Sequence, residues 1–298
     1  MDRHLSFLKP GTLWPALLER TAHAQRCGAI HSILTTTEVV EQGGVAFQVR
    51  LVTALAKKQE TIEAKPDANP FLPYDPDLFV AEISPTHVAL LNKFNVVDHH
   101  LLIVTRAFEE QQTQLTQKDC EALLIGLTEI DGLAFYNAGP AAGASQRHKH
   151  LQLIPLSSSV GPRLPIEPLL RGAQMSGATG IVPCLPFLHS YAPMDPGWTD
   201  PGKDSGASFL ACYRALLRAA GLAVEPTAGS HAPTAPYNLL VTRQWLLLVP
   251  RAQEHFKGIS INALGFAGAM LARNEAEVTM LRQHGPMTAL QHVDLPQR

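Results

Sequence analysis

The sequence has few cysteines, and none of them form a paired motif. Its four cysteines are scattered over 298 residues, with no Cys-x-x-Cys spacing. A disulfide framework and a zinc knuckle both need cysteines at defined spacings, so the sequence favours neither. Four isolated thiols are typical of a protein from a reducing compartment, and we therefore expect a cytoplasmic protein.

The chain also lacks a strong net charge and a long apolar segment. The formal net charge is −2, so no overall basic field favours a nucleic-acid polymer, although local charge can serve a small anionic ligand. The first ten residues, MDRHLSFLKP, lack the apolar stretch of a signal peptide. The most apolar segment, NLLVTRQWLLLVP, is short and is interrupted by Arg243 and Gln244. We expect neither a nucleic-acid polymer nor a membrane as a partner.

What the chain does contain is a mixture of helical and strand periodicities. Hydrophobic residues make up 46% of the sequence, enough for one large core or two modest ones. Apolar residues at helical spacing predict helices over residues 13–27, 115–131, 208–222 and 261–285. Thr116 can cap the second of these helices. Alternating or continuous apolar runs predict strands over residues 45–52, 133–139, 148–155, 237–242 and 245–251, and a strand–turn–strand over 95–106.

A weak internal repeat relates two distant parts of the chain. The segment HLLIVTR at 100–106 is similar to WLLLVPR at 245–251, and each is followed by a helix. Duplication and chance both explain such a match, because apolar strands look alike. Residues 156–208 are rich in Pro, Gly and Ser, which predicts a long connection with little regular structure. Strands joined by short turns indicate an α+β architecture of antiparallel sheets with helices packed on one face.

The segment GPAAGASQRHKHLQLIP, residues 139–155, holds the candidate chemistry. In a strand, alternate residues point the same way, so His148, His150 and Gln152 share one face. Lys149 and the leucines that follow it share the other face. The strand therefore has a polar face directly after a glycine-rich loop.

Three interpretations of this face differ in their chemistry. The histidines can be merely structural. They can bind a metal, which needs a further ligand such as His87, His99 or His100. An unprotonated imidazole can also attack phosphorus as a covalent nucleophile. That chemistry needs one fixed tautomer and donors that neutralise the phosphate oxygens. The candidate donors are Gly139, Gly143, Ala144, Ser145 and the Gln152 amide.

The longer segment YNAGPAAGASQRHKHLQLIP resembles the active-site segment of the ATP adenylyltransferases, also called diadenosine tetraphosphate phosphorylases. These enzymes belong to the galactose-1-phosphate uridylyltransferase-like branch of the histidine-triad superfamily. The similarity extends over residues 47–271 through LAKKQE, KPDANPF, LLNKFNVVDHHLLIVTRAFEEQQTQLT, LPFLHSYA, PYNLLVTRQWLLLVPR and FKGISINALGFAGAML. It implies two related histidine-triad-like halves of antiparallel sheet with flanking helices. The N-terminal catalytic half would span 1–160, the connector 161–207 and the C-terminal half 208–298.

The resemblance also implies the reaction, which is cleavage of diadenosine tetraphosphate by inorganic phosphate into ATP and ADP. His150 would be the nucleophile that takes AMP, with its far ring nitrogen held by a main-chain carbonyl, that of His148. Gln152 stands where the hydrolases of the superfamily have a third histidine. We expect Mg²⁺ to be carried by the polyphosphate, with no tightly bound cofactor and no protein-bound metal. Another nucleotidyltransferase, acting on a nucleotide sugar or adenylyl sulfate, and a non-catalytic dinucleotide sensor remain alternatives.

Further positions match substrate-binding residues of the family. They are Lys58, Asn92, Lys93, Asn137, Gly143, Ala144, Ser145, Gln146, Asn262, Ala263, Leu264, Ala269 and Arg273. Three of them depart from the usual pattern. Ala144 replaces a serine and removes a hydroxyl donor, Ala269 replaces a methionine, and Arg273 replaces a lysine, which keeps the charge but alters its reach. His189, in the connector, is expected to be structural. The sequence predicts no particular oligomeric state.

Overall fold

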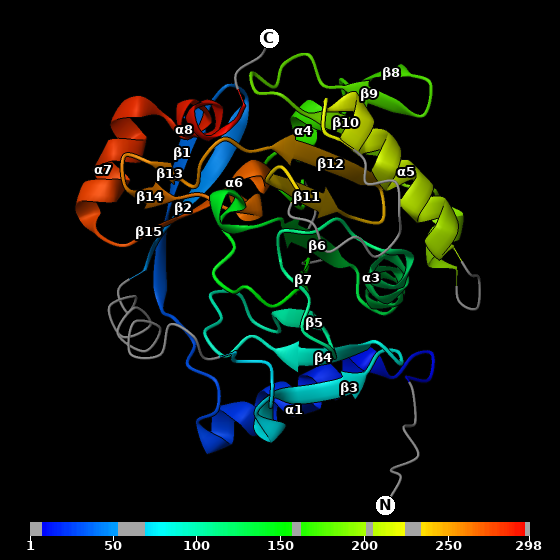
Figure 1. Ribbon diagram of the computed structural model, residues 1–298. Helices are drawn as coiled ribbons and strands as arrows, with labels where there is room; N and C mark the ends of the chain where they lie inside the picture. Colours follow the sequence, from blue (N-terminus) through cyan, green and yellow to red (C-terminus); the bar gives the residue numbers. More distant parts are fainter. Residues whose placement is uncertain (1–7, 53–68, 157–161, 201–204, 224–233, 296–298) are drawn as a thin grey trace, which may run out of the picture.

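A ten-stranded antiparallel sheet forms the centre of the computed structural model, which describes residues 8–52, 69–156, 162–200, 205–223 and 234–295 (Figure 1). The strand order is β3-β4-β5-β7-β6-β11-β12-β10-β9-β8. The first five strands are β3 (Phe79–Glu82), β4 (His87–Leu91), β5 (Leu101–Thr105), β7 (His150–Pro155) and β6 (Gly132–Asn137). The other five are β11 (Tyr237–Val241), β12 (Trp245–Pro250), β10 (Ser190–Pro193), β9 (Thr179–Ile181) and β8 (Gln174–Ser176).

Strands from the predicted N-terminal and C-terminal halves meet in the middle of this sheet. β6 pairs with β11, and Asn137 is the register partner of Asn238. The predicted connector is more regular than its composition suggested, because it supplies α4 (Glu167–Leu170) and the strands β8, β9 and β10. These strands are too short for a periodicity to stand out among prolines and glycines. The division at residues 160 and 207 stays a prediction.

One face of the sheet is covered by three helices, α1 (Leu13–Cys27), α3 (Gln117–Glu129) and α5 (Gly206–Ala219). Ile103 of β5, Leu151 of β7 and Leu123 of α3 belong to the buried cluster between these layers. The α3 helix begins as expected, because the Thr116 side chain accepts from the backbone N–H of Asp119 and the Asp119 carboxylate accepts from that of Thr116.

The other face is covered as well, which corrects the expectation that helices pack on one face only. A small sheet of β1 (Thr35–Gln42), β2 (Val45–Val52) and β15 (Ala269–Ala272) packs there with the C-terminal helices (Figure 1). These helices are α6 (Ala263–Ala267), α7 (Glu275–His284) and α8 (Pro286–Val293). β11 and β12 are buried along their whole length, because both of their faces meet a core. The α+β prediction is confirmed.

Two predicted elements differ from the structure. Of the segment 95–106, only residues 101–105 form a strand, and its hairpin partner is β4, which precedes the segment. The predicted helix over 261–285 is broken after α6 by Gly268, whose backbone φ of +99° is easy for glycine and strained for other residues. The chain then forms β15 before Asn274 caps α7. The predicted helix 13–27 and strand 45–52 are confirmed.

The remaining elements are short. The 3₁₀ turns are η1 (Pro76–Leu78), η2 (Pro140–Ala142) and η3 (Pro196–Thr199), and β13 (His255–Phe256) pairs with β14 (Ile259–Ser260). Within the described ranges, no helix combines the length and the apolar character that crossing a bilayer requires.

Candidate active site

A large cavity lies beside the polar face of β7. Its volume is about 1020 Å³, at the upper end of the range for small-molecule sites, so it has room for an extended ligand. Its walls come from β7, from the loop before β5, from the η2 loop and from β2, β15 and α6. The cavity therefore brings together segments from both ends of the chain.

Most of the predicted site residues that the structure describes line this cavity. They are Asn92, Lys93, Asn137, Gly143, Ser145, Gln146, His148, His150, Gln152, Asn262, Leu264 and Ala269. Lys58 lies outside the described residues. Three predicted residues, Ala144, Ala263 and Arg273, are not among the lining residues.

Arg273 has partners outside the lining of the cavity. Its guanidinium pairs with Glu277 at 2.6 Å and donates to the carbonyl of Gly258 at 2.8 Å. Its charge is thus paired with a carboxylate in the first turn of α7, and the predicted contact of Arg273 with a substrate stays a prediction.

The two alanines act through their backbones. Ala263 is buried at the start of α6, and its N–H donates to Asn137 Oδ1 at 3.1 Å. Ala144 closes the η2 loop, because its N–H donates to the carbonyl of Gly139 at 3.2 Å. These two bonds hold Asn137 and the η2 loop, both of which contribute to the lining of the cavity.

His150 is held as a neutral imidazole with one fixed tautomer. Its Nδ1–H donates to the carbonyl oxygen of His148 at 2.8 Å, the bond that the resemblance implied. Burial lowers the pKa of His150 to about 4, and the bond to the His148 carbonyl only partly offsets this effect. The proton therefore lies on Nδ1 at neutral pH, and the Nε2 lone pair is left for attack on an electrophile.

Gln111 clamps the backbone around His150, and sequence reasoning missed it. Its side-chain oxygen accepts from the His150 N–H at 2.8 Å, while its amide nitrogen donates to the carbonyls of His150 at 3.1 Å and Asn137 at 2.9 Å. The buried Gln111 thus ties the first residue of β7 to the last residue of β6. Its sequence context, EEQQTQ, is a polar run without a signal that separates it from its neighbours.

His148 is held at both ring nitrogens. Its Nε2 lies 2.7 Å from the carbonyl oxygen of Thr105, and its Nδ1 lies 2.9 Å from the Asn69 amide nitrogen. Phe71 packs against the rings of both His148 and His150, with ring centroids 5.7 Å and 5.3 Å apart. Phe71 thus forms an apolar wall that contributes to the burial of the two imidazoles.

The further metal ligands considered from sequence have other partners. His87 bonds Asp119 at 2.9 Å, His99 bonds Thr21 at 3.1 Å, and His100 bonds Gln152 at 2.9 Å. Only His100 lines the cavity. Among the described residues, none of the three is grouped with His148 and His150 at the spacing of metal ligands.

One group of side chains among the described residues has the spacing of a metal site. It consists of His23, Cys27 and Asp77. None of these residues lines the cavity, so the group lies apart from the candidate chemistry.

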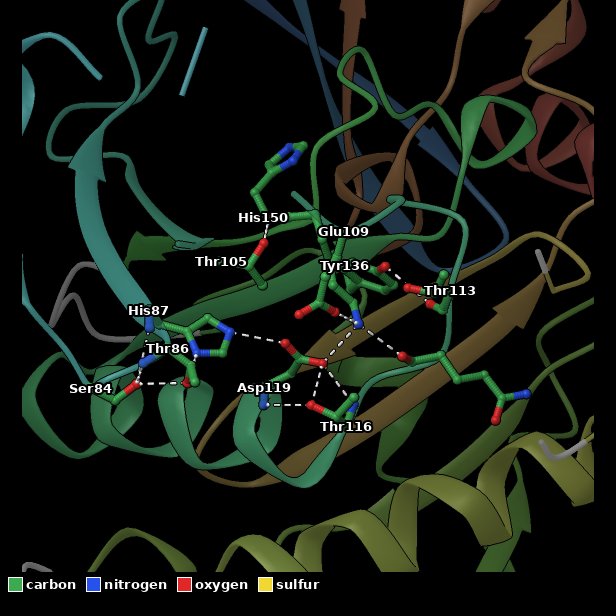
Figure 2. Close-up of polar contacts among 12 residues, drawn as sticks. Ser84, Thr86, His87, Thr105, Glu109, Thr113, Thr116, Asp119, Tyr136 and His150 are labelled. Atoms are coloured by element: carbon green, nitrogen blue, oxygen red, sulfur yellow. Dashed lines mark hydrogen bonds and ion pairs between the residues drawn. The ribbon is translucent and has the colours of Figure 1, made fainter. Parts of the chain in front are cut away.

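A buried ion cluster lies on the opposite side of the chain segment that carries His150 (Figure 2). The Lys149 ammonium contacts the carboxylates of Asp119 at 2.9 Å and Glu109 at 3.2 Å, and Asp119 also bonds His87. Burial raises the pKa of Asp119, but the hydrogen bond from His87 and the charge of Lys149 outweigh it and hold that pKa well below its ordinary value. Two consecutive residues are therefore held in place on opposite faces of the chain. Ion pairs hold Lys149 on one face, and hydrogen bonds hold His150 on the other.

The η2 loop reaches the cavity through glycine at positive φ. Gly143 has φ +82°, and a Cβ atom built on it would lie 2.8 Å from both the Asn262 side chain and the Ile261 carbonyl oxygen. Such a contact is too close for any side chain, so glycine is required where the loop meets the start of α6. The loop backbone and Asn262 therefore line the cavity next to each other.

The charge of the cavity wall is suited to a polyanion. The described lining residues with cationic side chains are Arg50, Lys93, Arg147 and Arg163. Two of them are partly neutralised by carboxylates that do not line the cavity, since Arg147 pairs with Glu110 and Arg163 with Asp131, each at 2.5 Å. Among the lining residues in the described part of the chain, Asp75 is the one carboxylate.

Taken together, these groups have the chemistry of group transfer between anions. A neutral imidazole with a free lone-pair direction can attack phosphorus. Amide donors and cations around it can stabilise the negative oxygens of a phosphoryl-type group as it is transferred.

His189 repeats the backbone geometry of His150 outside the cavity. Its Nδ1–H donates to the carbonyl of Phe187 at 2.8 Å, two residues earlier, and its Nε2 accepts from the Val182 N–H at 2.8 Å. Both ring nitrogens are occupied by backbone groups, which supports the structural role expected from sequence.

Comparisons with known proteins agree with this geometry. The family model described as Ap4A phosphorylase N-terminal domain matches residues 3–172, and that described as ATP adenylyltransferase C-terminal domain matches residues 183–296. The chain is 29% identical, over 75% of its length and 77% of the relative, to diadenosine 5′,5′′′-P1,P4-tetraphosphate phosphorylase 2 from Saccharomyces cerevisiae.

The fold is similar to that of solved yeast structures. The yeast Ap4A phosphorylase Apa2 in complex with Ap4A matches with a TM-score of 0.76 and 23% identity, covering 98% of this chain and 100% of that one. The same yeast enzyme in complex with AMP matches with a TM-score of 0.75 and 23% identity, covering 98% and 99%. The fold that was predicted from the sequence, a histidine-triad-like fold, is confirmed by this structural similarity.

Proposed function

The chain belongs to the Ap4A phosphorylase family, as its sequence predicted, and we propose that it cleaves diadenosine tetraphosphate (Ap4A) with inorganic phosphate to give ATP and ADP. One observation carries the proposal most directly. A buried imidazole beside a cavity of about 1020 Å³ is kept neutral, with its Nδ1 proton on the His148 carbonyl and its Nε2 lone pair available. That is the state a nucleophile toward phosphorus requires.

In the first step, His150 Nε2 attacks the α-phosphorus of Ap4A. A P–N bond forms, and the bond between that phosphorus and the bridging oxygen breaks, so that ATP leaves with the bonding electron pair. The ring becomes a cationic adenylyl-imidazolium that retains its Nδ1 proton. The His148 carbonyl at 2.8 Å stabilises this positive charge as it develops.

In the second step, a phosphate oxygen attacks the same phosphorus. The P–N bond breaks, its electron pair returns to Nε2, and ADP is released. The polyphosphate leaving group of the first step is a stable anion and needs no proton from the enzyme. Gln152 fits this requirement, because an amide donates a hydrogen bond but cannot give up a proton as an imidazolium does.

We propose that Mg²⁺ enters the site already bound to the polyphosphate of the substrate. Mg²⁺ prefers carboxylate and phosphate oxygens. Asp75, the one carboxylate among the described lining residues, already caps η1 by accepting from the Asp77 N–H, so the polyphosphate itself would supply most of the ligands. We place the reaction in the cytoplasm, a location that the four free cysteines support.

The test uses Ap4A without phosphate, followed by proteolysis and mass spectrometry. An acid-labile adenylyl group is expected on the peptide that contains His150 and not on the peptide that contains His189. His189 is an internal control, since it has the same carbonyl bond but lies outside the cavity. Added phosphate should then discharge the adduct as ADP, and His150→Ala should lower turnover by roughly three orders of magnitude or more.

Parallel substrates separate the alternatives. Faster adduct formation from a nucleoside diphosphate sugar or adenylyl sulfate than from Ap4A would favour another nucleotidyltransferase. Saturable Ap4A binding with neither adduct nor product would favour a dinucleotide sensor. Either result would overturn the proposal.

A further inference from the structure

We propose that His100 is a positioning residue that fixes the orientation of the Gln152 amide, so that its N–H donors face the substrate phosphates. The inference rests on the proposed function, and it deepens the description of the same site. His100 is buried, lines the cavity and directly precedes β5.

Strand register brings the two side chains together. Leu102 of β5 is the register partner of Gln152 of β7, and Val104 is the partner of His150. His100 lies two residues before Leu102, so continuing the strand alternation places it on the same face as its cross-strand neighbours. Its Nε2 lies 2.9 Å from Gln152 Oε1, a diagonal contact close to the nucleophile.

A backbone N–H sets the polarity of the bonds that lead to Gln152. The Phe94 N–H donates to Asn92 Oδ1 at 3.2 Å, so the Asn92 amide nitrogen is the group that faces His100. That nitrogen lies 3.2 Å from His100 Nδ1, which must therefore accept. The His100 proton is then on Nε2 and donates to Gln152 Oε1. A backbone N–H can only donate, so it fixes which group donates and which accepts in each bond from Phe94 through Asn92 and His100 to Gln152.

The consequence for Gln152 is a single amide orientation. An amide can present either its oxygen or its nitrogen to a ligand, and the two differ by a rotation about one bond. With Oε1 held by His100, the NH₂ group is the part that can face the cavity. The opposite orientation would present an oxygen to a polyphosphate and repel it. His100 acts on the reaction only through Gln152 and touches no reacting atom in this scheme.

The experiment measures single-turnover formation of the adenylyl adduct from Ap4A in a double-mutant cycle. Gln152→Ala is expected to slow adduct formation by about 10²- to 10³-fold, the effect of losing one donor to a developing charge. His100→Leu is expected to slow it by roughly tenfold or more in the wild-type background. In the Gln152→Ala background the same change should alter the rate by less than about twofold, because the residue through which it acts is gone.

Two variants that replace the imidazole with a side-chain amide supply a second test. A glutamine side chain places its terminal amide near the Nε2 position of histidine, whereas asparagine reaches only the Nδ1 position. His100→Gln should therefore retain the rate to within a few-fold, and His100→Asn should lose as much as His100→Leu.

His99 in the same loop offers a matched control. It bonds Thr21 and does not line the cavity, and its backbone φ of +57° is one that asparagine also tolerates. His99→Asn should therefore leave the rate of adduct formation unchanged.

The outcomes distinguish this inference from the proposed function. If wild-type protein forms no adduct on His150, the proposed function fails. If wild-type protein forms the adduct but the His100 and Gln152 effects multiply independently, His100 contributes only to structure and the inference is overturned. Equal losses in His100→Gln and His100→Asn would also overturn it. Melting temperatures measured for every variant identify any that are unfolded.

Discussion

The amide nitrogen of Asn238 lies 2.8 Å from the side-chain oxygen of Asn137, across the β6–β11 pair at the centre of the sheet. Asn238 is itself held by Arg251, whose guanidinium donates to its side-chain oxygen at 2.5 Å. Burial lowers the pKa of Arg251 to about 10, which leaves it charged at neutral pH. A buried cation from the C-terminal part of the chain therefore fixes Asn137, an amide that lines the cavity.

Replacing Asn238 tests this connection. Asn238→Leu removes one donor to Asn137 and one acceptor from Arg251, so we expect adduct formation to fall by roughly tenfold or more. The unsatisfied buried groups should cost about 1–3 kcal/mol in the free energy of unfolding. Single-turnover kinetics and urea unfolding measure the two effects. An unchanged rate in a destabilised variant would show that Asn137 does not depend on Asn238 for its orientation.

The ion cluster around Lys149 is predicted to matter for stability. Lys149→Met leaves the carboxylates of Asp119 and Glu109 without their shared ammonium. Removing one partner of a buried pair costs about 3–5 kcal/mol, and urea unfolding should show a loss of that size. Lys118→Met, on the exposed first turn of α3, is the control and should change stability by less than about 0.5 kcal/mol. A similar small change in Lys149→Met would contradict the prediction.

The pH dependence of adduct formation follows from the burial of His150. Because the pKa of His150 is lowered to about 4, the nucleophile stays unprotonated through the neutral and mildly acidic range. The single-turnover rate at saturating Ap4A should therefore vary by less than about twofold between about pH 7.5 and about pH 5.5. A rate that halves near the ordinary histidine pKa of about 6.5 would show that the ring is solvated in the working enzyme.

The same shift makes stability depend on pH. The pKa of His150 is about 4 in the folded chain and 6.5 ordinarily, so between these values the unfolded chain binds a proton that the folded chain does not. Stability therefore falls as the pH is lowered through this window. By linkage the loss is about 1.5 kcal/mol between about pH 6.5 and about pH 5. Urea unfolding of wild type and His150→Asn at both pH values isolates this contribution as the difference between the two proteins.

The contact between the η2 loop and α6 offers a further prediction. In Gly143→Ala the added Cβ would approach the Asn262 side chain to 2.8 Å, so the loop must move. Adduct formation should then fall by roughly tenfold or more, because the loop no longer places its donors correctly. Gly221→Ala has a similar φ of +72° and nothing within 4 Å, and so measures backbone strain alone. Equal activity in the two variants would mean that the fit between the loop and α6 has no catalytic importance.

Much of the site was predictable because its residues are close in sequence. The alternation of His148, His150 and Gln152 placed them on one face of a strand, and the glycines before them indicated a loop suited to phosphate. The family pattern added Asn92 and Asn262, which line the same cavity. Fold class followed from the periodicities, since strands and helices of ordinary length dominate the chain.

What could not be predicted depends on contacts between distant segments. Gln111 and His100 act through hydrogen bonds to residues that lie as far as 39 and 52 positions away, and no local pattern marks such residues. The charge of Arg273 does not reveal that Glu277 is its partner in the fold. The layer on the second face of the sheet was missed because an apolar strand does not reveal how many of its faces are covered.

The pairing of β6 with β11 has a consequence for how the chain can be divided experimentally. Cutting the polypeptide between the two strands would leave each fragment with an unpaired row of backbone donors and acceptors along a wholly buried strand. Such an edge promotes self-association, so each piece is expected to aggregate when it is made alone. Produced together, the pieces should reassemble along this seam, which would make turnover of Ap4A a readout of fragment complementation.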